Sequence, residues 1–173
     1  MGAGGAVVAV DVKTGEILAC ATYPSYDLST YAEDYQSLAS DSLSPLLNRA
    51  THGLYTVGSI YKPMVSIAGL STGLISRDSI INCTGTYHFY SDYSPTCLGV
   101  HLGVNVEHAL RQSCNIFFYD LGRKLGIDNI NLFASQFGLG SKTGIEISEA
   151  AGQLSSPETR KAAGDEWGPG APL

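Results

Sequence analysis

The sequence predicts an α+β fold, because strand-like and helix-like patterns both occur in a chain of one-domain length. Two β-rich runs, residues 6–12 and 17–23, are joined by a short turn that contains Gly15. Farther along, apolar residues recur at helical spacing in residues 60–70 and 106–121. With 44% hydrophobic and 15% charged residues among 173, the chain is expected to fold around a core.

The first element is predicted to be a β-hairpin, and an irregular segment follows it. Valine and small apolar residues dominate both runs, and Gly15 can adopt the positive φ that a tight turn needs. Residues 24–45 are rich in Ser, Asp and Tyr and show no clean period. We therefore interpret them as a long surface excursion.

Segments with apolar residues at helical spacing are predicted to be helices: residues 60–70, 106–121 and 128–138. Gly58 and Gly73 flank the first of them, and Asn105 is a suitable N-cap for the second. Residues 76–103 mix Gly, Tyr, Thr and two cysteines, which is typical of loops with short strands.

The charge pattern argues against nucleic acid as a partner. The formal net charge is −6, and no run of basic residues offers a surface that could follow phosphates. Uninterrupted apolar runs also stay far below the ~18 residues of a membrane-spanning helix. Residues 1–4 lack the charged and apolar regions of a signal peptide, so we interpret them as a linker.

Ser59 and Lys62 form the most informative pair in the chain, because their spacing places both on one face of a helix. A serine hydroxyl becomes a good nucleophile when a base takes its proton, and a lysine serves when burial or nearby positive charge lowers its pKa. Pro63 has no N–H and is tolerated in the first helical turn, so Ser59 is expected at a helix N-terminus. The partial positive charge there favours a developing oxyanion.

Each short motif also has an ordinary structural interpretation. Ser59 can be a first-turn residue with Lys62 as a solvated charge. The S-x-N triplet of Ser113, Cys114 and Asn115 can arise by chance. The order, spacing and flanks of the motifs decide between these interpretations.

Taken in order, the motifs resemble the transpeptidase domain of penicillin-binding proteins, and most closely the class B, elongation-type enzymes. The resemblance extends over nearly all of residues 5–170. The stretches that carry it are the hairpin of residues 5–27, Asn-Arg-Ala at 48–50, residues 55–63 around the S-x-x-K motif, residues 109–118 around the S-x-N triplet, and residues 137–152.

The resemblance implies a penicillin-binding-protein/serine β-lactamase-like transpeptidase fold, in which a helical cluster packs on an antiparallel sheet that is incomplete here. Ser59 would be the acylated nucleophile and Lys62 its general base. Ser113 would relay the proton, and Asn115 would bind the substrate amide and fix the lysine, so that Ser59, Ser113 and Asn115 contact substrate. The family breaks the helix of residues 106–121 near Ser113, and it implies no cofactor and no metal.

The implied activity is that of a peptidoglycan D,D-transpeptidase, which cross-links D-Ala–D-Ala stem peptides through a serine acyl-enzyme. Stem peptides, β-lactam antibiotics and the cell-wall elongation machinery are the implied partners. The family works on the extracytoplasmic face of the bacterial cell membrane, held by an anchor that is not visible in this chain. The alternatives are a non-catalytic penicillin-sensing or scaffold domain of the same fold, and a serine β-lactamase.

The third family motif, a K-[ST]-G triplet on a strand, is expected to be missing. Lys13-Thr14-Gly15 falls at the hairpin tip, and Lys142-Thr143-Gly144 falls in a stretch that is structural in the family. Losing one oxyanion donor costs about 10²–10³ in rate. We therefore expect residues 1–173 to be a single, partial transpeptidase domain with weak or no activity. Its exposed sheet edge would favour self-association.

The cysteines leave several interpretations open. Cys83 and Cys97 close a 15-residue loop, in which a disulfide would stabilise the fold by about 3 kcal/mol. The same two residues can instead be reduced structural cysteines, or they can form a zinc site with His88 and His101. Cys114, inside the S-x-N triplet, is assigned to packing.

Overall fold

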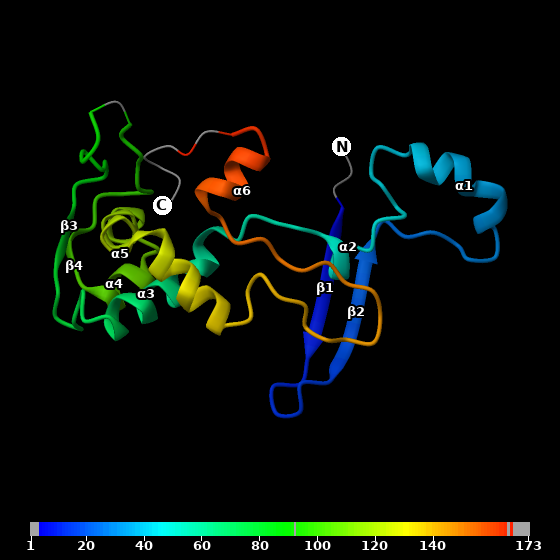
Figure 1. The fold of residues 1–173 in the computed structure, drawn as a ribbon, viewed down its shortest axis with the longest axis horizontal. Coiled ribbons are helices and arrows are strands. Elements are labelled where there is room, and N and C mark those ends of the chain that lie inside the picture. The colour runs from blue at the N-terminus through cyan, green and yellow to red at the C-terminus, as the bar shows by residue number, and fades with distance from the viewer. Residues whose placement is uncertain (1–3, 92, 166, 168–173) are drawn as a thin grey trace. The chain divides into compact units, whose positions relative to one another are not determined.

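The computed structural model describes residues 4–91, 93–165 and 167, and it divides into two compact units (Figure 1). The first unit comprises the chain up to Tyr55 together with Lys142–Gly152. The second comprises Thr56–Ser141 and the chain from Gln153. Residues 1–3 of the predicted linker lie outside the described part. Helices and strands occur together, as the predicted α+β class requires.

The first unit is built on the predicted hairpin. β1 (Gly5–Val10) pairs antiparallel with β2 (Ile17–Tyr23), so the prediction is confirmed. The turn between them uses Gly15 at φ 77°, and Asp11 Oδ1 accepts a hydrogen bond from the Lys13 N–H at 2.7 Å. Most residues of both strands are exposed.

The surface excursion predicted for residues 24–45 contains an exposed helix, α1 (Tyr31–Ser40), which the sequence pattern did not indicate. None of its residues is buried, and without a core-facing stripe the sequence carries no helical period. Its acidic first turn, with Glu33 and Asp34, suits the positive end of the helix dipole. Tyr31 and Tyr35 lie on one face, with ring centroids 5.7 Å apart.

A short helix ties the segment Lys142–Gly152 into the first unit. Asn48 caps α2 (Arg49–His52) by accepting the Ala50 N–H at 3.1 Å. Thr51 O accepts the Ala150 N–H at 2.9 Å, which anchors the later segment beside α2.

The second unit holds the other elements: η1 (Gly58–Tyr61), α3 (Lys62–Ser71), β3 (Ile81–Cys83), β4 (Leu102–Val104), α4 (Val106–Arg111), α5 (Asn115–Gln136) and α6 (Pro157–Ala162). Its core lies where α3 and α5 pack together and α5 packs against β3. Phe117 and Leu121 are fully buried there. β3 and β4 pair antiparallel, as expected for short strands within residues 76–103.

The predicted helices appear with one correction. The first runs as η1 and α3 and stops before Gly73, whose φ is 70°. Residues 106–121 do not form one helix, because the chain breaks between α4 and α5, as the family resemblance implied. The helix predicted for residues 128–138 appears as the second part of α5, which follows a kink at Gly126, whose φ of 72° is not helical.

Helix α6 was not predicted from the sequence. Ser156 accepts the Thr159 N–H at 3.1 Å while Thr159 Oγ1 accepts the Ser156 N–H, so the two residues form a capping box. The usual sequence signal for a capping box has Glu or Gln at the third helical position. Thr159 occupies that position here, so the usual signal is absent. Among residues 4–91, 93–165 and 167, no helix is long and apolar enough to cross a bilayer.

Candidate active site

The four residues predicted to form the site lie together in the second unit, joined by a chain of hydrogen bonds. Lys62 Nζ donates to Ser113 O at 2.8 Å, to Ser113 Oγ at 2.9 Å and to Asn115 Oδ1 at 2.7 Å. Ser113 Oγ in turn donates to Ser59 Oγ at 3.0 Å. The link from lysine to nucleophile therefore runs through the Ser113 hydroxyl, and all three ammonium protons have acceptors.

The local chain geometry explains why Ser59 sits at a helix start. Gly58 has φ 57°, a conformation that glycine adopts without strain, and it turns the chain into η1. The Lys62 N–H donates to Ser59 O, so the tight turn passes directly into α3. Pro63 stands in the first turn of α3, as its missing N–H requires.

Ser113 occupies the break between α4 and α5 in a left-handed conformation, with φ 50°. Such a conformation costs a non-glycine residue about 1–2 kcal/mol. The break is held by the Cys114 N–H, which donates to Ala109 O at 2.8 Å, and by the Ser113 N–H, which donates to Leu110 O at 3.1 Å. This turn directs both the carbonyl and the hydroxyl of Ser113 at the Lys62 ammonium.

Asn115 begins α5, and its side chain is oriented by two contacts. Its Oδ1 accepts from Lys62, while its Nδ2 donates to Thr96 O at 3.3 Å. Its backbone N–H donates to Cys97 Sγ at 3.2 Å. The segment around Thr96 and Cys97 therefore holds the last residue of the S-x-N triplet through both backbone and side chain.

Partial burial gives Lys62 the character of a base. Burial lowers its pKa below the usual value of 10.5, and the opposing influence of Cys97 and Cys114 is smaller. The ammonium also lies 5.5 Å from the centroid of the Phe118 ring, so an aromatic face forms one side of its surroundings. A lowered pKa increases the neutral fraction that can accept a proton.

Both K-T-G triplets have local structural partners. Lys13, Thr14 and Gly15 form the turn between β1 and β2, where Thr14 Oγ1 donates to Glu16 Oε2 at 3.0 Å. In the second triplet, Glu149 accepts from Thr143 Oγ1 and from the Gly144 N–H, each at 2.8 Å. Neither triplet lies on a strand, which favours the structural interpretation of both.

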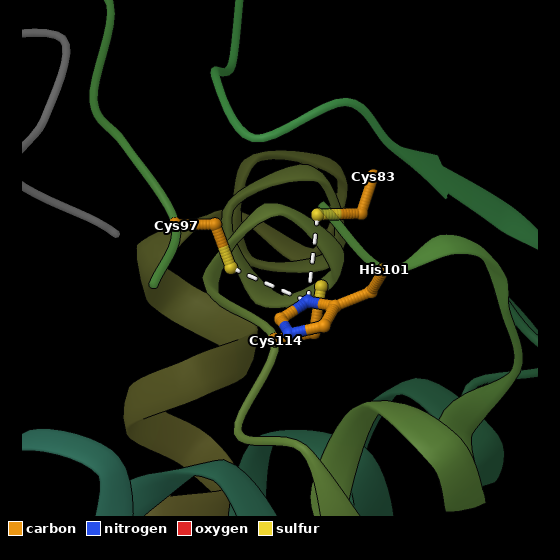
Figure 2. A group of neighbouring side chains, drawn as sticks. All are labelled: Cys83, Cys97, His101 and Cys114. Carbon is orange, nitrogen blue, oxygen red and sulfur yellow. Dashed lines mark hydrogen bonds between the residues drawn. The ribbon is translucent and has the colours of Figure 1, made fainter. Parts of the chain in front are cut away.

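A second cluster of reactive side chains includes Cys114, the middle residue of the S-x-N triplet (Figure 2). The side-chain donor atoms of Cys83, Cys97, His101 and Cys114 all lie within 4.8 Å of one another. His101 Nδ1 is 3.6 Å from the sulfurs of both Cys83 and Cys97. All of these thiols are free, so the structure contains the reduced state of the Cys83–Cys97 pair.

Three thiols and one imidazole are a donor set typical of structural zinc sites. In a tetrahedral site with Zn–S bonds of about 2.3 Å, neighbouring sulfurs lie about 3.8 Å apart, so small inward shifts would close the cluster on an ion. Burial opposes ionisation of Cys97, but N–H donors from Gly99, Ile116 and Asn115 outweigh it and lower the Cys97 pKa to about 6. At Cys114, burial raises the pKa to about 12.

The composition of this cluster corrects the zinc interpretation made from the sequence. His88 is exposed and does not belong to it, whereas Cys114, which was assigned to packing, takes its place. Cys83, Cys97 and His101 are the three residues that the interpretation from the sequence named correctly. Cys114 joins them through the fold, because it precedes α5 and faces the loop that carries Cys97.

The fold and the Ser59–Lys62–Ser113–Asn115 geometry define a class of serine acyl-transfer domains with an S-x-x-K nucleophile motif. The family model described as the penicillin binding protein transpeptidase domain matches residues 5–165. The chain therefore belongs to that family. Its curated relative from Acinetobacter baumannii, a peptidoglycan D,D-transpeptidase MrdA, is 37% identical over 91% of this chain and 25% of the relative. The chain thus spans about a quarter of the length of that relative.

Solved structures support the same family and fold. Pseudomonas aeruginosa PBP2, in complex with WCK 5153, matches with a TM-score of 0.85 and 35% identity over 99% of this chain and 41% of the other. PBP2 of Helicobacter pylori in complex with MreC has a TM-score of 0.87 and 26% identity, over 99% and 34%. Penicillin-binding protein A of M. tuberculosis, a penicillin G acyl-enzyme, has a TM-score of 0.72 and 30% identity, over 85% and 38%.

Proposed function

We propose that this chain is part of the single catalytic domain of a peptidoglycan D,D-transpeptidase, in which Ser59 attacks the D-Ala–D-Ala bond of a stem peptide. The observation that carries the proposal is the continuous hydrogen-bond path from Lys62 Nζ through Ser113 Oγ to Ser59 Oγ. The family and its D,D-transpeptidase relatives support the same substrate class.

In the proposed mechanism, the neutral form of Lys62 accepts a proton through Ser113. Ser59 Oγ–H then donates to Ser113 Oγ, whose own proton passes to Lys62 Nζ while Ser59 Oγ bonds to the substrate carbonyl carbon. The carbonyl oxygen becomes an oxyanion near the positive N-terminal end of the Ser59 helix. Return of the proton to the departing amine releases D-Ala and leaves an acyl-enzyme, which an amine of a second stem peptide resolves.

Asn115 has a positioning and binding role in this mechanism. Its Oδ1 holds Lys62, and its Nδ2, which now donates to Thr96 O, is the group that can turn to a substrate amide. Without the contact between Asn115 and Lys62, the ammonium could move away from Ser113. Ser113 and Asn115 therefore position the same base.

The proposed setting follows from the relatives. A β-lactam would acylate Ser59, as penicillin G acylates penicillin-binding protein A of M. tuberculosis. The complex of Helicobacter pylori PBP2 with MreC supports a partner in the cell-wall elongation machinery. We place the domain on the extracytoplasmic face of the bacterial cell membrane, where peptidoglycan is assembled. Activity of the 173-residue chain alone is expected to be weak, because both K-T-G triplets are engaged elsewhere.

The test is the intact mass of the chain after incubation with benzylpenicillin. We expect an adduct of one drug mass that is absent in Ser59→Ala and retained in Ser37→Ala, an exposed serine on α1. An adduct that survives Ser59→Ala would refute the proposed nucleophile. No adduct on a folded chain would mean that these four residues do not suffice for acylation without the third motif.

A second measurement separates the transpeptidase from its alternatives. Release of D-Ala from a pentapeptide stem with transfer to an amine acceptor supports the proposal. Steady turnover of the β-lactam would favour a β-lactamase, and a stable penicillin adduct without D-Ala release would favour a sensing domain.

A further inference from the structure

The Thr96 carbonyl decides how the Asn115 side chain is oriented. It accepts a hydrogen bond from Asn115 Nδ2 at 3.3 Å, so Asn115 Oδ1 is the atom that faces Lys62 Nζ, at 2.7 Å. If the amide turned over, its NH2 group would point at an ammonium, which has three donors and no acceptor. The contact between the asparagine and the lysine therefore depends on where the Thr96 carbonyl lies.

A short antiparallel ladder fixes the direction of that carbonyl. Thr96 O and the Cys97 N–H belong to one planar trans peptide group, in which they point in opposite directions. The N–H donates to Gly85 O at 2.8 Å, so the carbonyl is directed away from Gly85. The next bond of the ladder joins the Tyr87 N–H to Pro95 O at 2.9 Å. The segment that carries Gly85 and Tyr87 therefore sets the direction of the Thr96 carbonyl.

The side chain of Tyr87 fastens this ladder to α5. Tyr87 is buried, and its hydroxyl donates to Asp120 Oδ1 at 3.1 Å and accepts from Arg123 Nε at 2.9 Å. Arg123 also donates to Asp120 Oδ1 at 3.1 Å, so the three side chains are joined in a ring of hydrogen bonds. The Arg123 guanidinium lies over the Phe89 ring, 3.9 Å from its centroid. Asp120 stands five residues after Asn115, about 7.5 Å along the same helix.

The carboxylate that anchors the Tyr87 hydroxyl is charged. Burial alone would raise the pKa of Asp120, but hydrogen bonds from Lys124, Arg123 and Tyr87 outweigh it and lower the pKa below the usual value of 3.8. Hydrogen bonds to a charged acceptor are stronger than those between neutral groups. The Tyr87 hydroxyl is therefore held firmly, and the ladder is attached to α5 at two points, one at Asp120 and one at Asn115.

We propose that Tyr87 is a positioning residue for acylation, which places the Thr96 carbonyl and thereby orients the Asn115 amide. The inference rests on the proposed function, since it concerns the base of the same site. Without the Tyr87 hydroxyl, the ladder can move relative to α5, and the amide loses the acceptor that fixes its orientation. Lys62 is then held less well beside Ser113, so the chemical step slows.

The first measurement follows the Asn115 side-chain amide by NMR, because this readout requires no acylation. The amide signals are identified by their loss in Asn115→Ala. In Tyr87→Phe, which removes only the hydroxyl, we expect the Nδ2 proton that bonds to Thr96 O to move upfield as that hydrogen bond weakens. Tyr35→Phe removes the hydroxyl of an exposed tyrosine on α1, in the other unit, and should leave the signals unchanged. Unchanged Asn115 signals in Tyr87→Phe would overturn the inference.

A double-mutant cycle on acylation by benzylpenicillin separates positioning from stability. Tyr87→Phe should lower the acylation rate at saturating drug about three- to tenfold, the effect of one lost hydrogen bond, and leave the apparent binding of the drug unchanged. In Asn115→Ala, which has no amide to orient, the same loss of the hydroxyl should not change the rate. Equal factors in the two backgrounds, or a lower melting temperature with an unchanged rate, would overturn the inference. If the parent chain is not acylated, the four site residues do not suffice without the third motif, and the NMR comparison alone decides whether Tyr87 orients Asn115.

Discussion

At the scale of single residues, the site depends on where Lys62 finds its acceptors. Its ammonium contacts the carbonyl and hydroxyl of Ser113 and the amide oxygen of Asn115, all carried by the break between α4 and α5. Burial lowers the Lys62 pKa and so increases the fraction of the side chain that is neutral. The contacts that hold the protonated side chain also surround this neutral form. The chemistry therefore depends on one proton at one nitrogen.

The first prediction concerns pH. Because the base must be neutral, the rate of benzylpenicillin acylation should rise with pH and level off above the Lys62 pKa, which lies below 10.5. In the unfolded chain this pKa returns upward, so the unfolded state binds more protons and stability gains from this group as pH rises. Rate constants from mass spectra across the pH range test this. Lys161→Ala, at an exposed position, should keep the profile, and a flat profile in the parent chain would contradict a lysine base.

The second prediction separates backbone strain from chemistry at Ser113. Both Ser113→Ala and Ser113→Gly remove the relay hydroxyl, so both should lose acylation. Glycine tolerates the φ of 50°, so Ser113→Gly should be more stable than Ser113→Ala by about 1 kcal/mol. Urea unfolding of the two variants measures the difference. Equal stabilities would mean that the left-handed turn stores no strain.

At the scale of elements, sequence patterns predicted what contacts the core and missed what does not. The α5 pattern was visible because Phe117 and Leu121 face inward. The α3 prediction was right for a weaker reason, because Ile60, Ile67 and Leu70, at helical spacing with the buried Met64, are exposed. Helix α1 buries nothing, so its period was invisible. The break at Ser113 was also hidden, since apolar spacing continues across it, and only the family resemblance placed it. Three members of the cysteine cluster were named from the sequence, and only Cys114 was missed, because the fold brings it in from a separate segment.

The third prediction tests the close approach of α3 and α5. A Cβ at Gly69 would lie 2.8 Å from Leu121 Cδ1 and 3.1 Å from Ile75 Cγ1. Alanine normally favours a helix over glycine, but here the overlap should prevail and destabilise the chain by about 1–3 kcal/mol. Gly5→Ala, with nothing within 4 Å of the added carbon, is the control. A melting temperature for Gly69→Ala at or above that of the parent would show that Leu121 repacks freely.

The fourth prediction concerns the Cys83–Cys97–His101–Cys114 cluster. Titration with Co²⁺ should give the thiolate charge-transfer absorption of a tetrahedral site, and Zn²⁺ should displace it. Cys114→Ser should weaken the band, whereas Cys20→Ser, outside the cluster, should leave it intact. Bound Zn²⁺ should also raise the melting temperature, because it binds the folded chain preferentially. An identical Co²⁺ spectrum for Cys114→Ser would exclude that thiol as a ligand.

At the scale of the whole molecule, the two units differ in how far they bury their own elements. The second unit has a contiguous core, whereas β1 and β2 leave most of their residues exposed. The family resemblance indicated this imbalance, because it implied an incomplete sheet with an exposed edge. Val7 and Leu18 are 66% and 68% exposed, an unusual condition for apolar strand residues.

The exposed hairpin therefore leads to the last prediction, that the chain self-associates. Unpaired strand edges and apolar strand faces favour pairing with a second copy, and the net charge of −6 opposes that pairing only weakly in salt. Light scattering should show a mass that rises with protein concentration. Leu18→Lys, which places a charge on an exposed face of β2, should shift the chain toward monomer, whereas Leu132→Lys, exposed on α5, should not. A constant monomer mass across concentrations would mean that the strand edges and apolar faces of the hairpin do not pair with a second copy. Equal effects of the two lysines would instead assign the association to net charge rather than to the hairpin, since both variants change the charge equally.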